Sequence, residues 1–488
     1  MPSFKDFIQI DKGADIAIYL QVVNAIIQQI RRGQLRSGSK LPGSRELAEA
    51  LTVHRKTIVA AYDELMAQGW IEMIPRKGTF VMQDLPEIKP KKLKQGEPVL
   101  LYPEKTIFAI PENRPGAFPD PVIPDSTRLI INDGFPDTRL VPNELLLREL
   151  RSLGRQTAFR KYHMYGRPEG TDYLRETLAG FLRETRGLPI SAANVMITRG
   201  AQMGIYLTAQ LLLKPGDQVI VGESSYFAAT LTFQQAGAHI NRVPVDEFGI
   251  DIDVVEQLCE KKRIRLLYVI PHHHHPTTVT LPPERRIRLL ELAATYKFAI
   301  VEDDYDYDFH YTSNPVQPMA SLDHHGSVIY IGTLSKTLVP AVRVGFIVAP
   351  ENFVRAVANL RMAIDRQGDS MMEIAIAELY RNGTIGRHIR KVVNLYRERR
   401  DHFCALLTDR LGERVSFKIP DGGMAIWTKF TDSDLRQVSV KAYQKGLIMS
   451  DGQRYNTGQT NYNSARLGFA SLTLSEQGKA MDILVNCL

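Results

Sequence analysis

The stretch YIGTLSKTLVPAVRVGFIVAP, residues 330–350, carries the pattern on which the fold assignment depends. Its apolar start predicts a strand, and Lys336 follows that strand with hydroxyl side chains at Thr333 and Ser335 and a guanidinium at Arg343. Apolar flanks shield a lysine from bulk water, which favours the neutral amine. The hydroxyls and Arg343 are suited to bind a phosphate. Taken alone, the segment also fits an ordinary surface lysine after a strand, so other segments must distinguish the two interpretations.

Short apolar runs alternate with helix-length segments throughout this part of the chain. The runs are VMIT, QVIVGE, LLYVIP, FAIVEDD and VIYIGT, and segments such as 202–213 and 282–296 separate them. Strands that alternate with helices predict an α/β domain with a mainly parallel sheet covered on both faces. Polar residues that end such strands gather at the carboxyl edge of the sheet, where ligands bind.

Three further segments supply what a pyridoxal 5′-phosphate site requires. FAIVEDDYD offers an acid for the pyridine nitrogen and a tyrosine for the ring oxygen, and TRGAQMG begins a helix whose first N–H groups meet the phosphate. A tyrosine after QVIVGE can stack on the ring. Each feature is common alone, but their order together with Lys336 predicts this cofactor. The residues concerned are Asp303, Tyr305, Gly200, Ala201, Gln202 and Tyr226.

The N-terminal segment has a different pattern. Apolar residues from Leu20 to Ile30 recur at helical spacing, Ser44 can cap a helix in LPGSRELAEAL, and a further helix opens with Thr52 in TVHRKTIVAAYDELMAQGW. Two strands, 70–74 and 79–82, then flank a basic turn. Two short helices joined by a tight turn and followed by a basic hairpin predict a winged helix-turn-helix.

Polar and basic side chains gather where such a unit meets DNA. Short polar and basic residues in the first turn of a recognition helix reach base edges and phosphates together. We expect double-stranded DNA to contact Ser44, Arg45, His54, Arg55, Lys56, Thr57, Arg76, Lys77 and Gly78.

Residues 41–81, LPGSRELAEALTVHRKTIVAAYDELMAQGWIEMIPRKGTFV, closely resemble the winged helix of the GntR family. His54 stands where that family usually has serine, and Gly43 is a variation in the turn. The resemblance implies DNA binding. The residues that fit the family pattern are Leu41, Pro42, Ser44, Arg45, Arg55, Thr57, Gly78, Thr79 and Phe80.

The remainder of the chain, from Asp125 to Leu488, resembles fold-type I aminotransferases. The resemblance implies that Lys336 is the Schiff-base lysine and that Arg466, in ARLGFA, grips an effector carboxylate. It also implies that Tyr165 reaches the phosphate of a neighbouring subunit. His275 stands where aminotransferases carry an asparagine beside the ring oxygen. The other implied cofactor residues are Asp303, Tyr305, Tyr226, Thr333, Ser335 and Arg343.

Together the two parts resemble the MocR/GabR subfamily of transcription regulators. This implies a head-to-tail homodimer with exchanged DNA-binding heads, bound to operator DNA. An amino-acid or amine effector would displace Lys336 as an external aldimine, or the cofactor itself would be the signal. Two alternatives remain open: an active aminotransferase carrying a DNA-binding module, and a scaffold that no longer uses its cofactor.

The length and composition of the chain limit the number of domains and the class of protein. A chain of 488 residues predicts at least two folding units, and we expect a winged helix at 1–82, a linker at 83–124 and the aminotransferase-like domain at 125–488. The formal net charge of +7 is compatible with a polyanionic partner. The three cysteines lie far apart, which argues against a zinc cluster and a disulfide framework.

Neither a metal nor a membrane is expected as a partner. Four successive histidines, 272–275, would point to alternate faces of a strand and could not converge on one ion. No apolar run is long enough to span a bilayer. We therefore expect a bacterial cytoplasmic protein that joins the nucleoid when bound to DNA.

Overall fold

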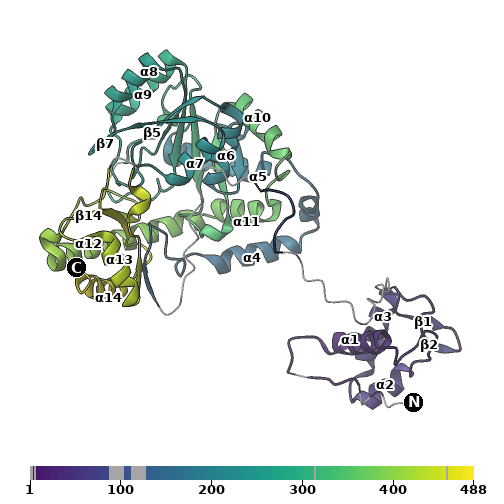
Figure 1. Cartoon of the computed structure of the whole chain (residues 1–488). Coiled ribbons are helices and arrows are strands. Elements are labelled where there is room, and N and C mark those ends of the chain that lie inside the picture. The colour runs from purple at the N-terminus through teal and green to yellow at the C-terminus, as the bar shows by residue number, and fades with distance from the viewer. Residues whose placement is uncertain are drawn as a thin grey trace. The chain divides into compact units, whose positions relative to one another are not determined.

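The computed structural model describes residues 4, 7–11, 13–86, 104–110, 128–312, 315–457 and 460–488. The chain forms two compact units, residues 1–110 and 111–488 (Figure 1). Most of the predicted linker, 83–124, lies outside the described residues. In the parts of the chain that the structure describes, no helix is both long enough and apolar enough to cross a membrane.

The N-terminal unit has the predicted winged helix-turn-helix architecture. Its buried core joins all three helices to the hairpin through Ile26, Leu47, Ile58, Leu65 and Trp70. The two strands pair antiparallel, with Ile71 opposite Val81. Its elements are α1 (Ile18–Arg31), α2 (Ser44–Leu51), α3 (Arg55–Ala67), β1 (Ile71–Ile74) and β2 (Gly78–Val81).

The predicted helix starts in this unit were wrong by one to three residues. Gly43, not Ser44, is the N-cap of α2, and its N–H donates to Glu46 Oε2 at 3.3 Å. Helix α3 begins at Arg55 instead of Thr52, because Thr52 adopts a left-handed conformation at the C-cap of α2. His54 caps α3, since its Nδ1 accepts from the N–H of Lys56 at 3.2 Å.

The C-terminal unit is built on a seven-stranded sheet. All neighbouring pairs run parallel except those of β12, which is antiparallel to both β11 and β4. The prediction of a mainly parallel sheet is confirmed. Across the sheet the strands are β4 (Val195–Thr198), β12 (Gly345–Val348), β11 (Val328–Thr333), β10 (Ala299–Asp304), β9 (Ile264–Val269), β5 (Gln218–Gly222) and β6 (His239–Val243).

Helices cover both faces of this sheet (Figure 1). Successive strand residues point to opposite faces, so Val219 and Val221 belong to one apolar core and Ile220 to the other. Full burial on both faces explains why the strands are continuous apolar runs. One face packs against α6 (Ala201–Leu212), α7 (Phe227–Gln235) and α10 (Glu351–Met362). The other packs against α4 (Asn143–Gly154), α5 (Asp172–Arg186), α8 (Ile252–Lys261), α9 (Pro283–Tyr296) and α11 (Ser370–Arg381).

A second lobe with its own apolar core follows, and the sequence pattern indicated only one of its strands. Strand β3 pairs in parallel with β15, Leu129 opposite Leu447, so the start of this unit is held against its C-terminal part. Outside this lobe, a short antiparallel hairpin follows β6 of the large sheet and consists of β7 (Val245–Asp246) and β8 (Gly249–Ile250). The lobe contains β3 (Leu129–Ile131), α12 (Thr384–Leu411), β13 (Val415–Phe417), β14 (Ala425–Phe430), α13 (Leu435–Gln444), β15 (Leu447–Met449), β16 (Ser464–Gly468) and α14 (Leu474–Val485).

The segment after β3 is anchored by a buried ion pair. Asp137 is 3% exposed, and its Oδ2 accepts from Arg399 Nη1 at 2.9 Å. The N–H of Asp137 donates to the hydroxyl of Tyr396 at 2.9 Å, and Arg399 also donates to the carbonyl of Ala470. Through these contacts, helix α12 fixes the position of the segment around Asp137, which follows β3.

We predict that Asp137→Ala lowers the free energy of unfolding of the C-terminal unit by about 3–5 kcal/mol, because it leaves the Arg399 charge buried and uncompensated. Urea titration followed by far-UV circular dichroism measures the change. Asp409→Ala, on the exposed face of α12, is the control and should change the value by less than about 0.5 kcal/mol. Equal effects of the two substitutions would contradict the anchoring role of Asp137.

Candidate functional site

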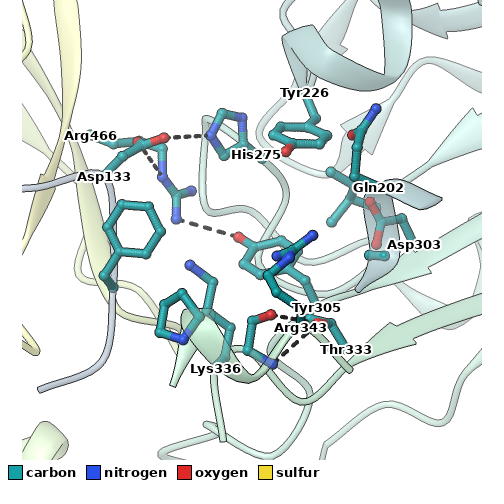
Figure 2. A pocket seen from close by; sticks show the side chains of 15 residues that line it. Asp133, Gln202, Tyr226, His275, Asp303, Tyr305, Thr333, Lys336, Arg343 and Arg466 are labelled. Atoms are coloured by element: carbon teal, nitrogen blue, oxygen red, sulfur yellow. Dashed lines mark hydrogen bonds and ion pairs between the residues drawn. The ribbon is translucent and has the colours of Figure 1, made fainter. Parts of the chain in front are cut away.

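A cavity of about 200 Å³ opens at the carboxyl edge of the large sheet (Figure 2). It brings together side chains from segments that are far apart in the sequence, including most of the predicted cofactor residues. The predicted residues that line it are Ala201, Gln202, Tyr226, His275, Asp303, Tyr305, Thr333, Ser335, Lys336, Arg343 and Arg466. Four residues that the sequence did not single out also line it: Asp133, Phe135, Ile270 and Pro340.

Lys336 lies in the turn that follows β11 and points its amine into the cavity (Figure 2). Nζ donates to the carbonyl oxygen of Gly134 at 2.8 Å and lies 4.2 Å from the ring centre of Phe135. Burial lowers the pKa of the amine to about 8; Asp133 opposes the shift and Arg466 adds to it. A sizeable fraction of Lys336 is therefore neutral near pH 7.5, and the neutral amine is the nucleophilic form.

Asp303 is the buried acid of the site. It is the last residue but one of β10, next to Asp304. It is 3% exposed, and its Oδ2 accepts from the hydroxyl of Tyr268 at 2.6 Å. Its Oδ1 has no hydrogen-bond partner among the residues that the structure describes. Burial raises the pKa of Asp303 to about 7, although the Tyr268 hydroxyl acts against that shift. A cationic N–H group in the cavity would donate a hydrogen bond to the unpartnered Oδ1 and favour the charged form of this carboxylate.

The N-terminus of α6 and Arg343 together form a site for an anion. The first N–H groups of a helix lack internal acceptors and carry the positive end of its dipole. Arg343 Nη2 donates to the carbonyl of Arg199 at 2.9 Å, which holds the guanidinium beside Gly200. Gly200 has φ +77, a conformation that favours glycine, and a Cβ there would lie 2.7 Å from Arg343 Nη2 and displace the guanidinium.

Hydroxyl groups and an aromatic ring complete the lining. Thr333 Oγ1 accepts from the Ser335 N–H at 3.1 Å and donates to Ser335 Oγ at 3.0 Å. The Gln202 side-chain amide donates to Thr232 Oγ1 at 2.8 Å, and its backbone N–H belongs to the first turn of α6, where helix N–H groups lack internal acceptors. Tyr226 precedes α7 and meets the His275 ring edge-on at 5.5 Å. Burial raises the pKa of Tyr226 to about 12, so this ring stays neutral.

A cluster of charged and polar groups lies on the side of the cavity away from Asp303 (Figure 2). Arg466, on β16, is 1% exposed, with Nε 3.2 Å from Asp133 Oδ1 and Nη2 3.3 Å from the hydroxyl of Tyr305. Asp133 also bonds His275 Nε2 at 3.0 Å and accepts from the Tyr455 hydroxyl at 2.7 Å. Burial acts to raise the pKa of Asp133, but these partners hold it well below its usual range.

The four histidines lie in the loop after β9, so the predicted strand placement was wrong. All four are buried, and each ring has its own partner. His273 bonds Asp306 at 2.9 Å, His274 bonds Thr277 at 2.8 Å, and His272 bonds the carbonyl of Val316. Burial lowers the pKa of His275 despite the neighbouring Asp133, so His275 is neutral near pH 7.

Tyr165 is the one predicted cofactor side chain that lies away from this cavity. It is 73% exposed, and its ring stacks under the guanidinium of Arg366 at 4.1 Å. Tyr165 is expected to reach the cofactor phosphate of a neighbouring subunit. A single chain does not test that prediction.

Sequence reasoning missed four residues of the cavity lining, Asp133, Phe135, Ile270 and Pro340, and it also missed Tyr455, which contacts Asp133. Asp133 follows the apolar strand β3 and precedes Gly134. A polar residue at a strand end before glycine is a turn signal, and it could have marked the position. Tyr455 ends a single turn of 3-10 helix, Gln453–Tyr455, which is too short to give a comparable sequence pattern.

The predicted DNA-contacting residues lie at the start of α2, at the start of α3 and in the hairpin turn. Arg45, His54, Arg55 and Lys56 are exposed, as are Arg76 and Lys77 in the turn. Ser44, Thr57 and Gly78 are half-buried, and Ser44 Oγ accepts from Arg55 Nε at 3.4 Å. The hydroxyl of Tyr62 donates to the carbonyl of Pro42 at 2.8 Å and so fixes α3 against the turn before α2.

Known proteins share both parts of this architecture. Residues 128–484 match the family "Aminotransferase class I and II", and residues 18–81 match "Bacterial regulatory proteins, gntR family". The probable rhizopine catabolism regulatory protein MocR of Rhizobium meliloti is 29% identical over 95% of this chain and 92% of its own length. The uncharacterized HTH-type transcriptional regulator YdfD of Bacillus subtilis is 28% identical over 94% of each chain.

A solved structure extends the similarity to three dimensions. The Pyrococcus horikoshii kynurenine aminotransferase, in complex with PMP, superposes with a TM-score of 0.69 at 28% identity and covers 74% of this chain and 91% of its own. The aminotransferase fold implies pyridoxal phosphate as the cofactor, and the gntR-family domain implies DNA binding. The chain belongs to the aminotransferase class I and II family, and its N-terminal gntR-family domain makes it a transcription regulator of the MocR type.

Proposed function

We propose that this regulator binds operator DNA through its N-terminal unit and adjusts that binding according to what occupies the cavity around Lys336. The observation that carries the proposal is the meeting of Lys336, Asp303 and the N-terminus of α6 in one cavity. We assign the winged helix to residues 1–82, a linker to 83–124 and the sensing domain to 125–488.

The residues of the cavity fit pyridoxal phosphate. The unpartnered Oδ1 of Asp303 suits a protonated pyridine nitrogen. The first N–H groups of α6, Arg343, Thr333 and Ser335 suit a phosphate. When bound, the cofactor supplies an aldehyde that condenses with amines and a ring that withdraws electrons. Lys336 supplies the amine for that aldehyde, and Tyr226 supports the ring.

The N-terminal unit supplies the DNA contacts. Exposed basic side chains at the start of α3 and in the hairpin turn present positive charge to phosphates. Short side chains such as Thr57 allow close approach to base edges. Gly78, which begins β2 directly after the turn, permits backbone approach to a phosphate.

The exposed position of Tyr165 supports a homodimer in which this residue completes a partner's phosphate site. Two winged helices per dimer would suit paired operator half-sites. The head-to-tail, domain-exchanged arrangement is part of this proposal.

An amino-acid or amine effector acts by competing with Lys336 for the cofactor. It changes DNA affinity only if it binds two conformations of the protein unequally. In the variant proposal the cofactor is the signal, and its arrival alone changes DNA affinity.

We predict that pyridoxal phosphate shifts the affinity of the full chain for DNA from upstream of its own gene by at least about fivefold, the lower range of allosteric coupling. Lys336→Ala removes the shift, because the lysine holds the cofactor. Fluorescence anisotropy of labelled DNA, titrated with each protein with and without cofactor, measures it. Equal DNA affinities of wild type and Lys336→Ala, with and without cofactor, would contradict the variant in which the cofactor itself is the signal. The search would then turn to amine effectors.

Multiple turnover with an amino donor and a keto-acid acceptor would support the alternative function, an active aminotransferase.

A second prediction concerns the recognition helix. Arg55→Ala should weaken DNA binding about tenfold, and should reduce the slope of log affinity against log salt by about 0.9, if its guanidinium neutralises one phosphate. The same anisotropy titration at several salt concentrations gives both quantities. Arg32→Ala, at the exposed C-cap of α1, is the matched control and should leave the slope unchanged. An unchanged slope in Arg55→Ala would remove this residue from the DNA interface.

A further inference from the structure

A loop of the second lobe runs from Gly452 to Ser464, between β15 and β16, and the structure describes it apart from residues 458 and 459. The two ends of the loop lie against each other, since a Cβ on Gly452 would lie 2.5 Å from the carbonyl oxygen of Ser464. Tyr455 in this loop donates its hydroxyl to Asp133 Oδ1 at 2.7 Å. The loop therefore supplies one of the contacts of a carboxylate that lines the cavity.

The side chain of Glu223 contacts this loop from the large sheet. Its Oε1 accepts from the hydroxyl of Thr460 at 2.9 Å and from that of Thr457 at 3.4 Å. The hydroxyl of Tyr462 lies near the same carboxylate, and burial together with that carboxylate raises the pKa of Tyr462. Three hydroxyl groups of one loop thus gather around one carboxylate, and hydrogen bonds to an ionised acceptor are stronger than those between neutral groups.

Glu223 is itself fixed by the sheet. It directly follows β5, its N–H donates to the carbonyl of Val243 at 2.7 Å, and its carbonyl accepts from Arg242 Nη1 at 2.8 Å. The residue is half-buried and lies outside the cavity lining. Its backbone is therefore a fixed point on which the loop can be held.

Aromatic rings connect the Glu223 contact to the Asp133 contact. Trp427, on β14, meets the Tyr455 ring edge-on with centres 5.1 Å apart, and the Tyr462 ring with centres 6.4 Å apart. Tyr462 lies near Glu223, and Tyr455 bonds Asp133. Since closely packed rings do not move independently, loss of the Glu223 contact would also loosen Tyr455.

The Asp133 carboxylate depends on Tyr455 for part of its orientation. Its Oδ1 lies 3.2 Å from Arg466 Nε, and its Oδ2 bonds His275 Nε2 at 3.0 Å. Arg466 is 1% exposed and lines the cavity, where a guanidinium suits a carboxylate ligand. Because Tyr455, Arg466 and His275 share one carboxylate, a shift of Tyr455 would also disturb Arg466.

We propose that Glu223 is a positioning residue of the cavity, although it does not line it. By holding the loop Gly452–Ser464 on the large sheet, it keeps Tyr455 against Asp133 and so keeps Arg466 in place. Its effect on a carboxylate ligand rests on the proposed function, since that effect requires the cofactor-loaded cavity. Its effect on the loop does not.

The first test is hydrogen exchange of the full chain without cofactor, followed by mass spectrometry of peptides. Glu223→Ala should speed exchange of the backbone amides in 452–464 at least about tenfold, because a charge-assisted hydrogen bond is lost. It should also speed exchange in 131–137 at least about threefold, because Asp133 in that segment bonds Tyr455, 322 residues away in the sequence. Glu223→Gln keeps an acceptor oxygen and should restore both rates to within about twofold of wild type.

Glu247→Ala, at an exposed carboxylate in the turn after β7, is the matched control and should change neither segment. Should Glu223→Ala not fold, Thr460→Val removes a hydroxyl donor from the loop and keeps its shape, and the same two segments should exchange faster. Faster exchange in the loop alone, or in neither segment, would overturn the positioning role.

The second measurement is the apparent Kd of L-alanine for the cofactor-loaded chain, obtained from the visible absorbance of the bound cofactor. Glu223→Ala should raise this Kd at least about fivefold, because binding must then also order Arg466, and Glu223→Gln should preserve it. An equal or lower Kd in Glu223→Ala would overturn the role. A chain that shows no visible absorbance with pyridoxal phosphate would instead overturn the proposed function. In that case, and if wild type does not bind L-alanine, the exchange experiment alone decides the role of Glu223.

Discussion

The buried carboxylate of Asp303 sets the charge that a ligand of this cavity must balance. It is the last residue but one of a central strand, where both faces of the sheet are covered, and one of its oxygens lacks a partner among the described residues. An unpaired buried acid is costly, and the cost appears here as a pKa raised to about 7 by burial. A sheet that holds such a group in place is prepared for a ligand that carries a positive N–H at that position.

The order of the strands brings the other partners to this carboxylate. Strands β10 and β11 are neighbours and parallel, so Asp303 and the turn that carries Lys336 emerge at the same edge. Strand β12 returns antiparallel between β11 and β4, and its first residue, Gly345, passes so close that a Cβ would lie 2.6 Å from the backbone of Gly200. That contact holds the N-terminus of α6 beside Arg343. The anion and cation sites therefore lie within one cavity.

Much of this arrangement could be predicted from sequence, because it follows from local patterns. Apolar runs indicated the central strands, and the residues at their ends indicated Asp303, Thr333 and Lys336. The second lobe was largely missed, since its short strands β13 and β15 carry too few residues for a clear period. Asp133 reaches the cavity only because β3 pairs with β15, a contact across more than three hundred residues that no local pattern reveals. The N-cap at Gly43 was missed because Ser44 is the better capping residue by propensity.

We propose that Asp303 provides the counter-charge for the cofactor. The most direct test of this proposal is the apparent Kd of pyridoxal phosphate for the full chain, measured by visible absorbance in wild type, Asp303→Asn and Asp304→Asn. Asp304 is the adjacent buried carboxylate, bonded to the Tyr330 hydroxyl at 2.6 Å and absent from the cavity lining. We expect at least about tenfold weaker binding for Asp303→Asn, because a neutral amide cannot balance a protonated ring nitrogen, and a much smaller change for Asp304→Asn. Equal cofactor affinity in wild type and Asp303→Asn would contradict it.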